Sequence, residues 1–159
     1  MQKENYGEIM RVVLQRVQNA SVAIEDKIVG QIGKGILTLV GFESDDTPED
    51  LMWMAGKISR LRIFDDSEGV MNLSITDCKG EFLVVSQFTL HAKVKKGNRP
   101  SYIKAAPPEI SIPLYEQFLQ ILEKESNLTV RQGVFGADML VSLVNDGPVT
   151  IVIDTKNKE

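Results

Sequence analysis

Cysteine and histidine are almost missing from this chain. Its 159 residues include one cysteine, Cys78, and one histidine, His91. A lone cysteine cannot form an intramolecular disulfide, and it is typical of proteins from a reducing compartment. A zinc site of the common type needs three or four cysteine and histidine ligands, so one chain cannot build it. We therefore expect no metal site, and no pattern in the sequence calls for another cofactor.

Long apolar runs are missing as well. The best candidate, residues 36–42, is far shorter than the ~20 residues that a membrane-spanning helix needs. Residues 1–9 contain no apolar segment like that of a secretory signal. We therefore predict a cytoplasmic protein without a membrane segment. Because a strand pattern begins directly after Met10, we interpret residues 1–9 as an N-terminal extension, an alternative start or an added segment.

The chain has no strong excess of charge of either sign. It carries 18 basic and 22 acidic residues, a net charge of −4, which does not by itself indicate a nucleic-acid-binding protein. Residues 93–104 differ, because they include no acidic residue and several basic ones: Lys93, Lys95, Lys96, Arg99 and Lys104. Such a cluster beside Tyr102 suits an RNA backbone and the face of a base. A solvated loop is the alternative.

What the chain does contain is typical of an ordinary globular domain, with 43% hydrophobic and 25% charged residues. Runs of β-favouring residues separated by turns predict strands over residues 11–17, 21–24, 28–32, 36–42, 62–64, 73–77, 82–85, 129–132, 139–144 and 149–153. We predict an α+β fold: one compact, β-rich, barrel-like domain over residues 10–155 with antiparallel or mixed sheets. A short tail, residues 156–159, follows it.

Two amphipathic helices complete the predicted fold. The first begins at Thr47, a good N-cap, with Pro48 at the first helical position and an apolar stripe at helical spacing after it. The second has its apolar stripe between Ser111, a candidate N-cap, and Asn127. These two helices are expected to cover the sheet.

The stretch 81–90 changes character half way along. Residues 82–85 form an unbroken apolar run, which suits a strand that is covered on both faces. Polar side chains follow at its rim: Ser86, Gln87 and Thr89. A rigid rim of this kind holds polar groups still, which favours a functional site. The alternative is that these groups only satisfy neighbouring main-chain atoms.

The stretch 145–150 holds a second unusual combination. Asp146-Gly147 between two predicted strands indicates a hairpin turn with positive φ angles. Pro148 cannot donate a hydrogen bond to a sheet, and it allows a cis bond after Gly147. Either this turn does more than connect two strands, or the proline is simply tolerated at the start of an edge strand.

Together these motifs resemble those of the D-aminoacyl-tRNA deacylases, once called D-tyrosyl-tRNA deacylases. The likeness covers residue 10 to about residue 154 without a large gap, and only residues 1–9 depart from it. Five segments in the same order carry the resemblance: Met10–Val17, Ser86–Leu90, Gly97–Ser101, Phe135–Met139 and Asn145–Thr150.

The resemblance implies an enzyme that proofreads translation. It would hydrolyse the ester that joins a D-amino acid, or glycine, to the 3′-terminal adenosine of tRNA. The family forms homodimers of compact α+β subunits, with two active sites at the subunit interface. The catalytic residues implied are Ser86, Gln87, Phe88 and Thr89. The implied substrate pocket contains Phe135, Gly136, Ala137, Met139 and Asn145. The cations expected to contact tRNA are Lys95, Lys96 and Arg99.

The resemblance also implies how chirality is selected. Gly147 and Pro148, joined by a cis bond, would reach into the pocket of the partner subunit. An L-side chain would collide with this rigid turn, whereas the hydrogen of a D-residue or of glycine in the same position would fit.

Two chemical routes remain open at this point. Main-chain N–H groups of residues 86–89 can stabilise the oxyanion, assisted by Gln87 or Thr89 and by the substrate's own ribose 2′-hydroxyl. The rival route makes Thr89 a covalent nucleophile with His91 as its base, if the strand continues that far. The alternative function is a non-catalytic nucleic-acid-binding dimer with the same fold; the basic loop disfavours a small-molecule esterase.

Overall fold

Two long strands cross the whole molecule and pair with each other. The computed structural model describes residues 10–158, so the predicted N-terminal extension, residues 1–9, lies outside the described residues. The elements in chain order are β1 (Arg11–Ile24), β2 (Lys27–Ile32), β3 (Gly35–Gly41), α1 (Pro48–Arg60), β4 (Phe64–Asp65), β5 (Met71–Leu73), α2 (Ile75–Cys78), β6 (Glu81–Ser86), the 3-10 helix η1 (Phe88–His91), α3 (Pro108–Ser126), β7 (Val130–Gln132) and β8 (Leu140–Asp154).

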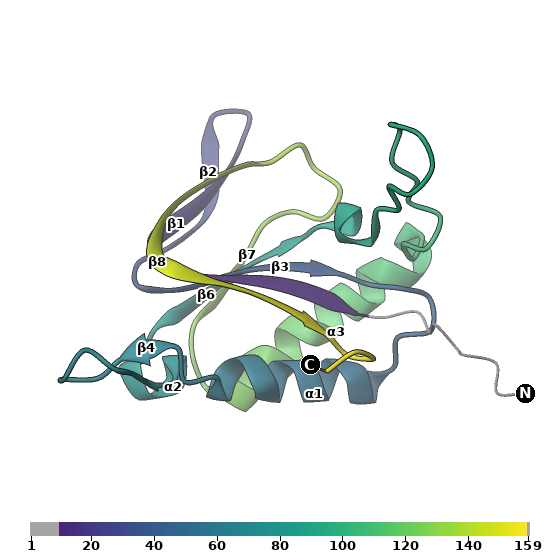
Figure 1. Ribbon diagram of the computed structural model, residues 1–159. Helices are drawn as coiled ribbons and strands as arrows, with labels where there is room; N and C mark the ends of the chain where they lie inside the picture. Colours follow the sequence, from purple (N-terminus) through teal and green to yellow (C-terminus); the bar gives the residue numbers. More distant parts are fainter. Residues whose placement is uncertain (1–9, 159) are drawn as a thin grey trace, which may run out of the picture.

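The main sheet is mixed and curls almost into a barrel (Figure 1). Its strand order is β2-β1-β3-β6-β7, with β8 paired to β1; β3, β6 and β7 run parallel, and the other pairs are antiparallel. The two ends of this order approach each other, because a Cβ on Gly30 of β2 would lie only 2.7 Å from the carbonyl oxygen of Gln132 in β7. The predicted α+β, barrel-like fold is confirmed.

The strand β6 is buried on both faces, as its apolar run predicts. Phe82 and Val84 pack into a core shared with α1 and α3, whereas Leu83 and Val85 pack into a second core. The helices α1 and α3 lie side by side against the sheet (Figure 1). Because both of its faces are packed, β6 holds its carboxyl end in a fixed position.

The helix α1 begins as predicted. The Thr47 Oγ1 atom accepts a hydrogen bond from the Asp50 main-chain N–H (3.3 Å), and the Asp50 carboxylate accepts one from the Thr47 N–H (2.9 Å). This capping box satisfies two N–H groups that have no partner inside the helix. The predicted stripe is buried at Leu51, Met54 and Ile58.

Two predicted interruptions in long strands are wrong. The strand β1 runs through residues 18–20, and β8 runs through the predicted hairpin at Asp146-Gly147. Gln15 pairs with Thr150 and Val17 with Asn145, so residues 146–149 stand opposite Arg16 alone and form a bulge. The Gly147–Pro148 bond is cis, as the resemblance implies, but Gly147 is not at positive φ. Pairing along β1 therefore overrides the local turn signal.

The predicted bounds of two short strands and of the second helix also need correction. Residues 75–78 form α2 instead of the end of a strand, because Ser74 and Asp77 make a second capping box. The predicted strand 62–64 is reduced to β4. The helix α3 starts at Pro108, and the Ser111 hydroxyl donates to the Pro107 carbonyl (3.1 Å) from within the first turn. Among residues 10–158, no helix has both the length and the apolar character to cross a membrane.

Candidate functional site

A cavity of about 310 Å³ opens at the carboxyl end of β6. It brings together two segments that are about fifty residues apart in the sequence, and both carry predicted site residues. The lining comprises Val85, Ser86, Gln87, Phe88, Phe135, Gly136, Ala137, Asp138, Met139 and Val141. Three of the four predicted catalytic residues and four of the five predicted pocket residues therefore share one cavity.

The edge of the cavity is formed where β6 turns into η1. The Gln87 N–H donates to the Val40 carbonyl (2.7 Å), which holds this point against β3. The N–H groups of Phe88 and Thr89 open η1, where no earlier helical carbonyl is available to them. Neither N–H donates to another group among the described residues. Two main-chain donors are therefore without a partner where β6 turns into η1, and the first of them belongs to Phe88, which lines the cavity.

The opposite wall is the turn after β7. Gly136 has φ +76°, which favours glycine, and the Ala137 N–H donates to the Val134 carbonyl (3.2 Å). The Phe135 ring packs on Tyr115 of α3 with a centroid distance of 5.9 Å. The Tyr115 hydroxyl in turn donates to the Val84 carbonyl (3.0 Å) in β6. Both walls of the cavity are thus tied to the same buried strand.

The structure does not support Thr89 and His91 as a nucleophile and its base. The strand ends at Ser86, so the two residues do not share a strand face. The Gln87 Nε2 group donates to the Thr89 Oγ1 atom, and Thr89 is absent from the cavity lining. His91 is buried at 3% exposure, with its Nδ1 atom 3.0 Å from Glu43 Oε1. No hydrogen bond joins Thr89 to His91 in the described part of the chain.

The bulge in β8 lies outside this cavity in the single chain. Gly147 and Pro148 are exposed, and so is Asn145, the predicted pocket residue that does not line the cavity. The Asn145 Nδ2 group donates to the carbonyls of Arg16 (2.9 Å) and Val149 (3.3 Å), which closes the bulge from within.

Arg16 braces the bulge from the β1 side, a role that the sequence did not suggest. Its side chain is buried, and its Nε atom donates to the Asp146 carbonyl (2.9 Å). Its Nη1 atom donates to the Ile63 carbonyl (2.7 Å) and approaches the Asp65 carboxylate (3.4 Å). An arginine in a strand gives no local signal of this kind, because all its partners are distant in sequence.

The basic loop, residues 93–104, lies next to the cavity. Lys95, Lys96 and Arg99 are exposed and do not line it. The base of the loop is closed by two main-chain hydrogen bonds between Lys93 and Ser101 (2.8 and 2.9 Å). The loop contacts the cavity edge through Tyr102, whose ring packs edge-to-face on the Phe88 ring with centroids 5.1 Å apart.

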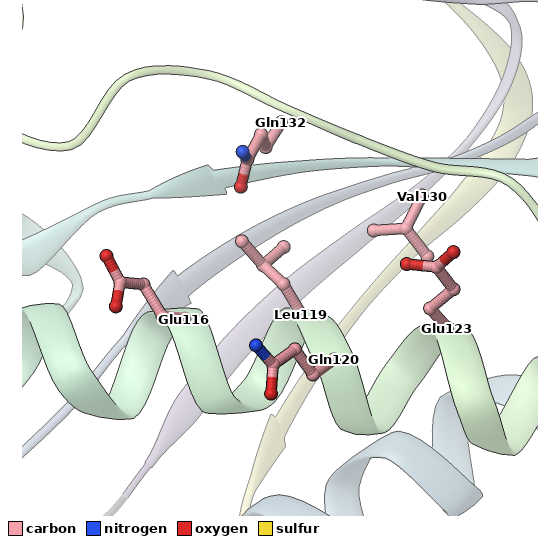
Figure 2. A pocket seen from close by; sticks show the side chains of 6 residues that line it. All are labelled: Glu116, Leu119, Gln120, Glu123, Val130 and Gln132. Carbon is pink, nitrogen blue, oxygen red and sulfur yellow. The ribbon is translucent and has the colours of Figure 1, made fainter.

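A second hollow, of about 290 Å³, lies between α3 and β7 (Figure 2). Its lining contains none of the predicted site residues and consists of Glu116, Leu119, Gln120, Glu123, Val130 and Gln132. Figure 2 shows Leu119 between the two glutamates, pointing toward β7. Two carboxylates repel the phosphates of a nucleic acid. The first cavity is therefore the better candidate for a site that acts on RNA.

Comparisons with known proteins show which proteins this chain resembles. A family model described as D-Tyr-tRNA(Tyr) deacylase matches residues 13–154. Curated proteins called D-aminoacyl-tRNA deacylase, from Flavobacterium psychrophilum and Porphyromonas gingivalis, are 62% and 63% identical over 94% of this chain and all of theirs. A solved structure titled c-Myc DNA Unwinding Element Binding Protein has 42% identity and a TM-score of 0.84, covering 90% of this chain and 97% of that one. Another, titled as a probable eukaryotic D-amino acid tRNA deacylase, shares the fold at 22% identity, with a TM-score of 0.81 over 92% and 99% of the two chains.

Proposed function

Because the chain belongs to the D-Tyr-tRNA(Tyr) deacylase family and is a hydrolase of D-aminoacyl-tRNA, we propose that the cavity at the end of β6 is where the ester is cleaved. The substrates would be tRNAs that carry a D-amino acid or glycine on the 3′-terminal adenosine. The observation that carries this proposal is the convergence of Ser86–Phe88 and Phe135–Met139 on one cavity beside free main-chain donors.

The chemistry proposed is hydrolysis assisted by the main chain. When the ester carbonyl is attacked, its oxygen becomes an oxyanion, and the unpartnered N–H group of Phe88, which lines the cavity, would stabilise it. One such donor is typically worth about 3–4 kcal/mol in the transition state. The substrate's ribose 2′-hydroxyl would assist the attacking water. This route needs no nucleophilic side chain, which fits the absence of Thr89 from the cavity lining.

Selection for the D-isomer is proposed to depend on a second subunit. Gly147 and Pro148 are exposed on one protomer and do not line its own cavity, so they are free to enter a partner's cavity. The strand that carries them also exposes large apolar side chains, at Leu140 (70%) and Val152 (59%). Exposed apolar surface of this kind is typical of a protein–protein interface. In the homodimer we propose, the bulge would block an L-side chain and admit hydrogen.

The basic loop is proposed to bind the tRNA. Lys95, Lys96 and Arg99 offer exposed cations for phosphates, and Phe88 and Tyr102 join the loop to the cavity edge. Phosphate contacts of this kind supply affinity that falls as salt rises. The unpaired Cys78 fits the reducing cytoplasm in which we propose that the protein acts.

The test of this function is the release of amino acid from charged tRNA. D-tyrosyl-tRNA, L-tyrosyl-tRNA and glycyl-tRNA are incubated with the full-length protein in the presence of EDTA, and free amino acid is measured. We expect release of D-tyrosine and glycine and none of L-tyrosine above background. Equal release of both tyrosine isomers, or none of either, would refute the proposal.

A nucleic-acid-binding function without catalysis is the second candidate. It is favoured by the 42% identical chain whose title names a DNA-unwinding-element-binding protein. A pure binding module would bind uncharged tRNA or single-stranded DNA and release no amino acid. Measuring binding and release on the same preparation separates the two functions.

A further inference from the structure

Three buried polar side chains at the carboxyl end of β3 take no part in the proposed chemistry. Glu43, Asp46 and His91 are 3%, 8% and 3% exposed. The His91 Nδ1 atom lies 3.0 Å from Glu43 Oε1, and Asp46 Oδ2 accepts a hydrogen bond from the Glu43 N–H (2.7 Å). His91 is the last residue of η1, so this cluster fastens the far end of the helix whose start borders the cavity.

Stability alone is a poor reason for this arrangement. Buried polar pairs lose hydration, and apolar residues of similar volume can often replace them without loss of stability. Here the loss of hydration is only partly compensated. Three buried side-chain atoms of this cluster have no hydrogen-bond partner among the described residues: Glu43 Oε2, Asp46 Oδ1 and His91 Nε2. What a directional contact adds over an apolar one is a fixed position.

The His91 ring packs at the same point as the cavity edge. A Cβ on Gly41 would lie 3.0 Å from His91 Cδ2 and Nε2, and 2.9 Å from the Gln87 carbonyl oxygen. The imidazole and the Gln87 carbonyl therefore both pack against the Cα of Gly41, on the side where any other residue would carry its side chain. If the ring moved, the Gln87 segment that borders the cavity would lose its neighbour.

The same cluster fastens both ends of the basic loop, residues 93–104. His91 stands just before this loop. At its other end the Ala106 N–H donates to the carbonyl of Phe42 (2.9 Å), the residue next to Glu43. The Arg11 Nη1 group adds a bond to the Leu90 carbonyl (2.7 Å). One short segment of chain after β3 therefore holds η1 and the two ends of the loop.

We propose that His91, held by Glu43, is a positioning residue that fixes the Gln87–Phe88 edge of the cavity and the attachment of the basic loop. The inference depends on the proposed function, because positioning matters only if this edge stabilises the reaction. His91 itself does not touch substrate, since it is buried and absent from the cavity lining.

The experiment compares variants that keep the directional contact with variants that lose it. His91→Asn keeps an N–H donor near the position of Nδ1, and Glu43→Gln keeps an acceptor. We expect both to retain kcat for D-tyrosine release within about threefold. His91→Phe and the double variant Glu43→Leu/His91→Phe keep apolar volume without the contact. We expect kcat to fall about tenfold or more in each, because small displacements of catalytic groups are costly. KM for charged tRNA should change much less.

A control separates positioning from stability. Leu51 is fully buried in α1 and remote in sequence from η1, so Leu51→Ala lowers the melting temperature by leaving a cavity. We expect it to keep the wild-type kcat below its melting temperature. If His91→Phe does not fold, the kcat of Glu43→Leu/His91→Phe tests the proposal instead, because this double variant leaves no buried Glu43 carboxylate without its partner. Wild-type kcat in a folded variant that lacks the contact would overturn the proposal.

A second readout does not depend on activity. Trypsin cleaves after Lys95 and Lys96 when the loop opens, so its rate reports the attachment of residues 93–104. We expect faster cleavage there in His91→Phe than in Leu51→Ala at equal stability. If the unsubstituted protein releases no D-tyrosine but trypsin still cleaves His91→Phe faster, the proposed function is refuted while the attachment of the loop is supported. Unchanged cleavage would refute the attachment.

Discussion

The guanidinium of Arg16 donates from Nε to the main-chain carbonyl of Asp146, 2.9 Å away, and so ties β1 to the bulge of β8. The same guanidinium reaches the Ile63 carbonyl through Nη1 (2.7 Å). Arg16 therefore holds three distant parts of the chain together from a buried position. If the bulge sorts substrates by shape, its position depends on this side chain.

Arg16→Lys should loosen the bulge while keeping the charge. A lysine cannot donate to both carbonyls in the fork geometry of arginine, so we expect a loss of about 2 kcal/mol in the free energy of unfolding. Release of L-tyrosine relative to D-tyrosine should rise. Denaturant unfolding and the two release assays check this. Arg62→Lys is the matched control, because exposed Arg62 also donates to a main-chain carbonyl (Asn72, 2.9 Å). Equal effects at both positions would contradict the role given to Arg16.

The main-chain route at the cavity edge predicts opposite results for two neighbouring residues. Thr89→Ala should keep kcat within about threefold, because no step uses the hydroxyl. Phe88→Pro removes one N–H donor at the first position of η1, where proline fits the backbone. We expect kcat about 100-fold below that of Phe88→Ala, which lacks the ring but keeps the donor. Loss of activity to background in Thr89→Ala would instead favour the nucleophile.

Asp46 should make stability depend on pH. Burial, aided by the nearby charges of Asp50 and Glu43, raises the pKa of Asp46 from 3.8 to about 7, against the opposing effects of the Glu43 N–H and Lys156. Between pH 4 and pH 7 the folded state keeps a proton that the unfolded state has released. Asp46 therefore lowers the free energy of unfolding most above pH 7, where it is ionised in the folded state. This loss of stability disappears as the pH falls toward 4.

The variant Asp46→Asn tests this dependence, because its amide oxygen can still accept from Glu43 and it does not titrate. Relative to wild type, Asp46→Asn should become more stable as pH rises from 4 to 8, by between about 1 and 3 kcal/mol. Chemical denaturation of both proteins across this range measures the difference. A constant difference would mean that Asp46 titrates normally.

The basic loop should affect tRNA binding and leave the chemical step unchanged. In Lys95→Ala/Lys96→Ala we expect KM for charged tRNA to rise several-fold at low salt with kcat nearly constant. The increase of KM with salt should also become shallower, because fewer phosphates are neutralised. Lys27→Ala, an exposed lysine on the β1–β2 hairpin, is the control. A large fall in kcat would place the loop within the reaction itself.

The sequence predicted the start of α1 and the buried strand β6, because each is marked by neighbouring residues. The capping box at Thr47 and Asp50 marks the start of α1, and the apolar run of β6 marks a strand buried on both faces. The motif residues Ser86 and Phe135 do share a cavity. The hairpin expected at Asp146-Gly147 is wrong, because pairing with β1 continues through it as a bulge.

What the sequence could not show depends on contacts between distant residues. Arg16 and Asp146 are separated by 130 positions, and Glu43 and His91 by 48, so neither pair leaves a periodic signal. The 3-10 helix η1 that follows β6 was not predicted either, and because of it Thr89 and His91 do not share a strand face. A resemblance to a family predicts the motif residues, but the residues that position them, such as Arg16 and His91, were identified only from the structure.

Mixed dimers give the sharpest test of the proposal that one subunit's bulge completes the other subunit's cavity. Ala137→Phe fills the cavity, and Gly147→Val adds bulk to the bulge; each homodimer should be inactive on D-tyrosyl-tRNA. In a mixed dimer with one copy of each variant, one site would carry both changes and the other neither. We predict that mixing restores about half of the wild-type activity per mixed dimer. If dimers form and activity stays at background, the bulge acts within its own subunit and the account is contradicted.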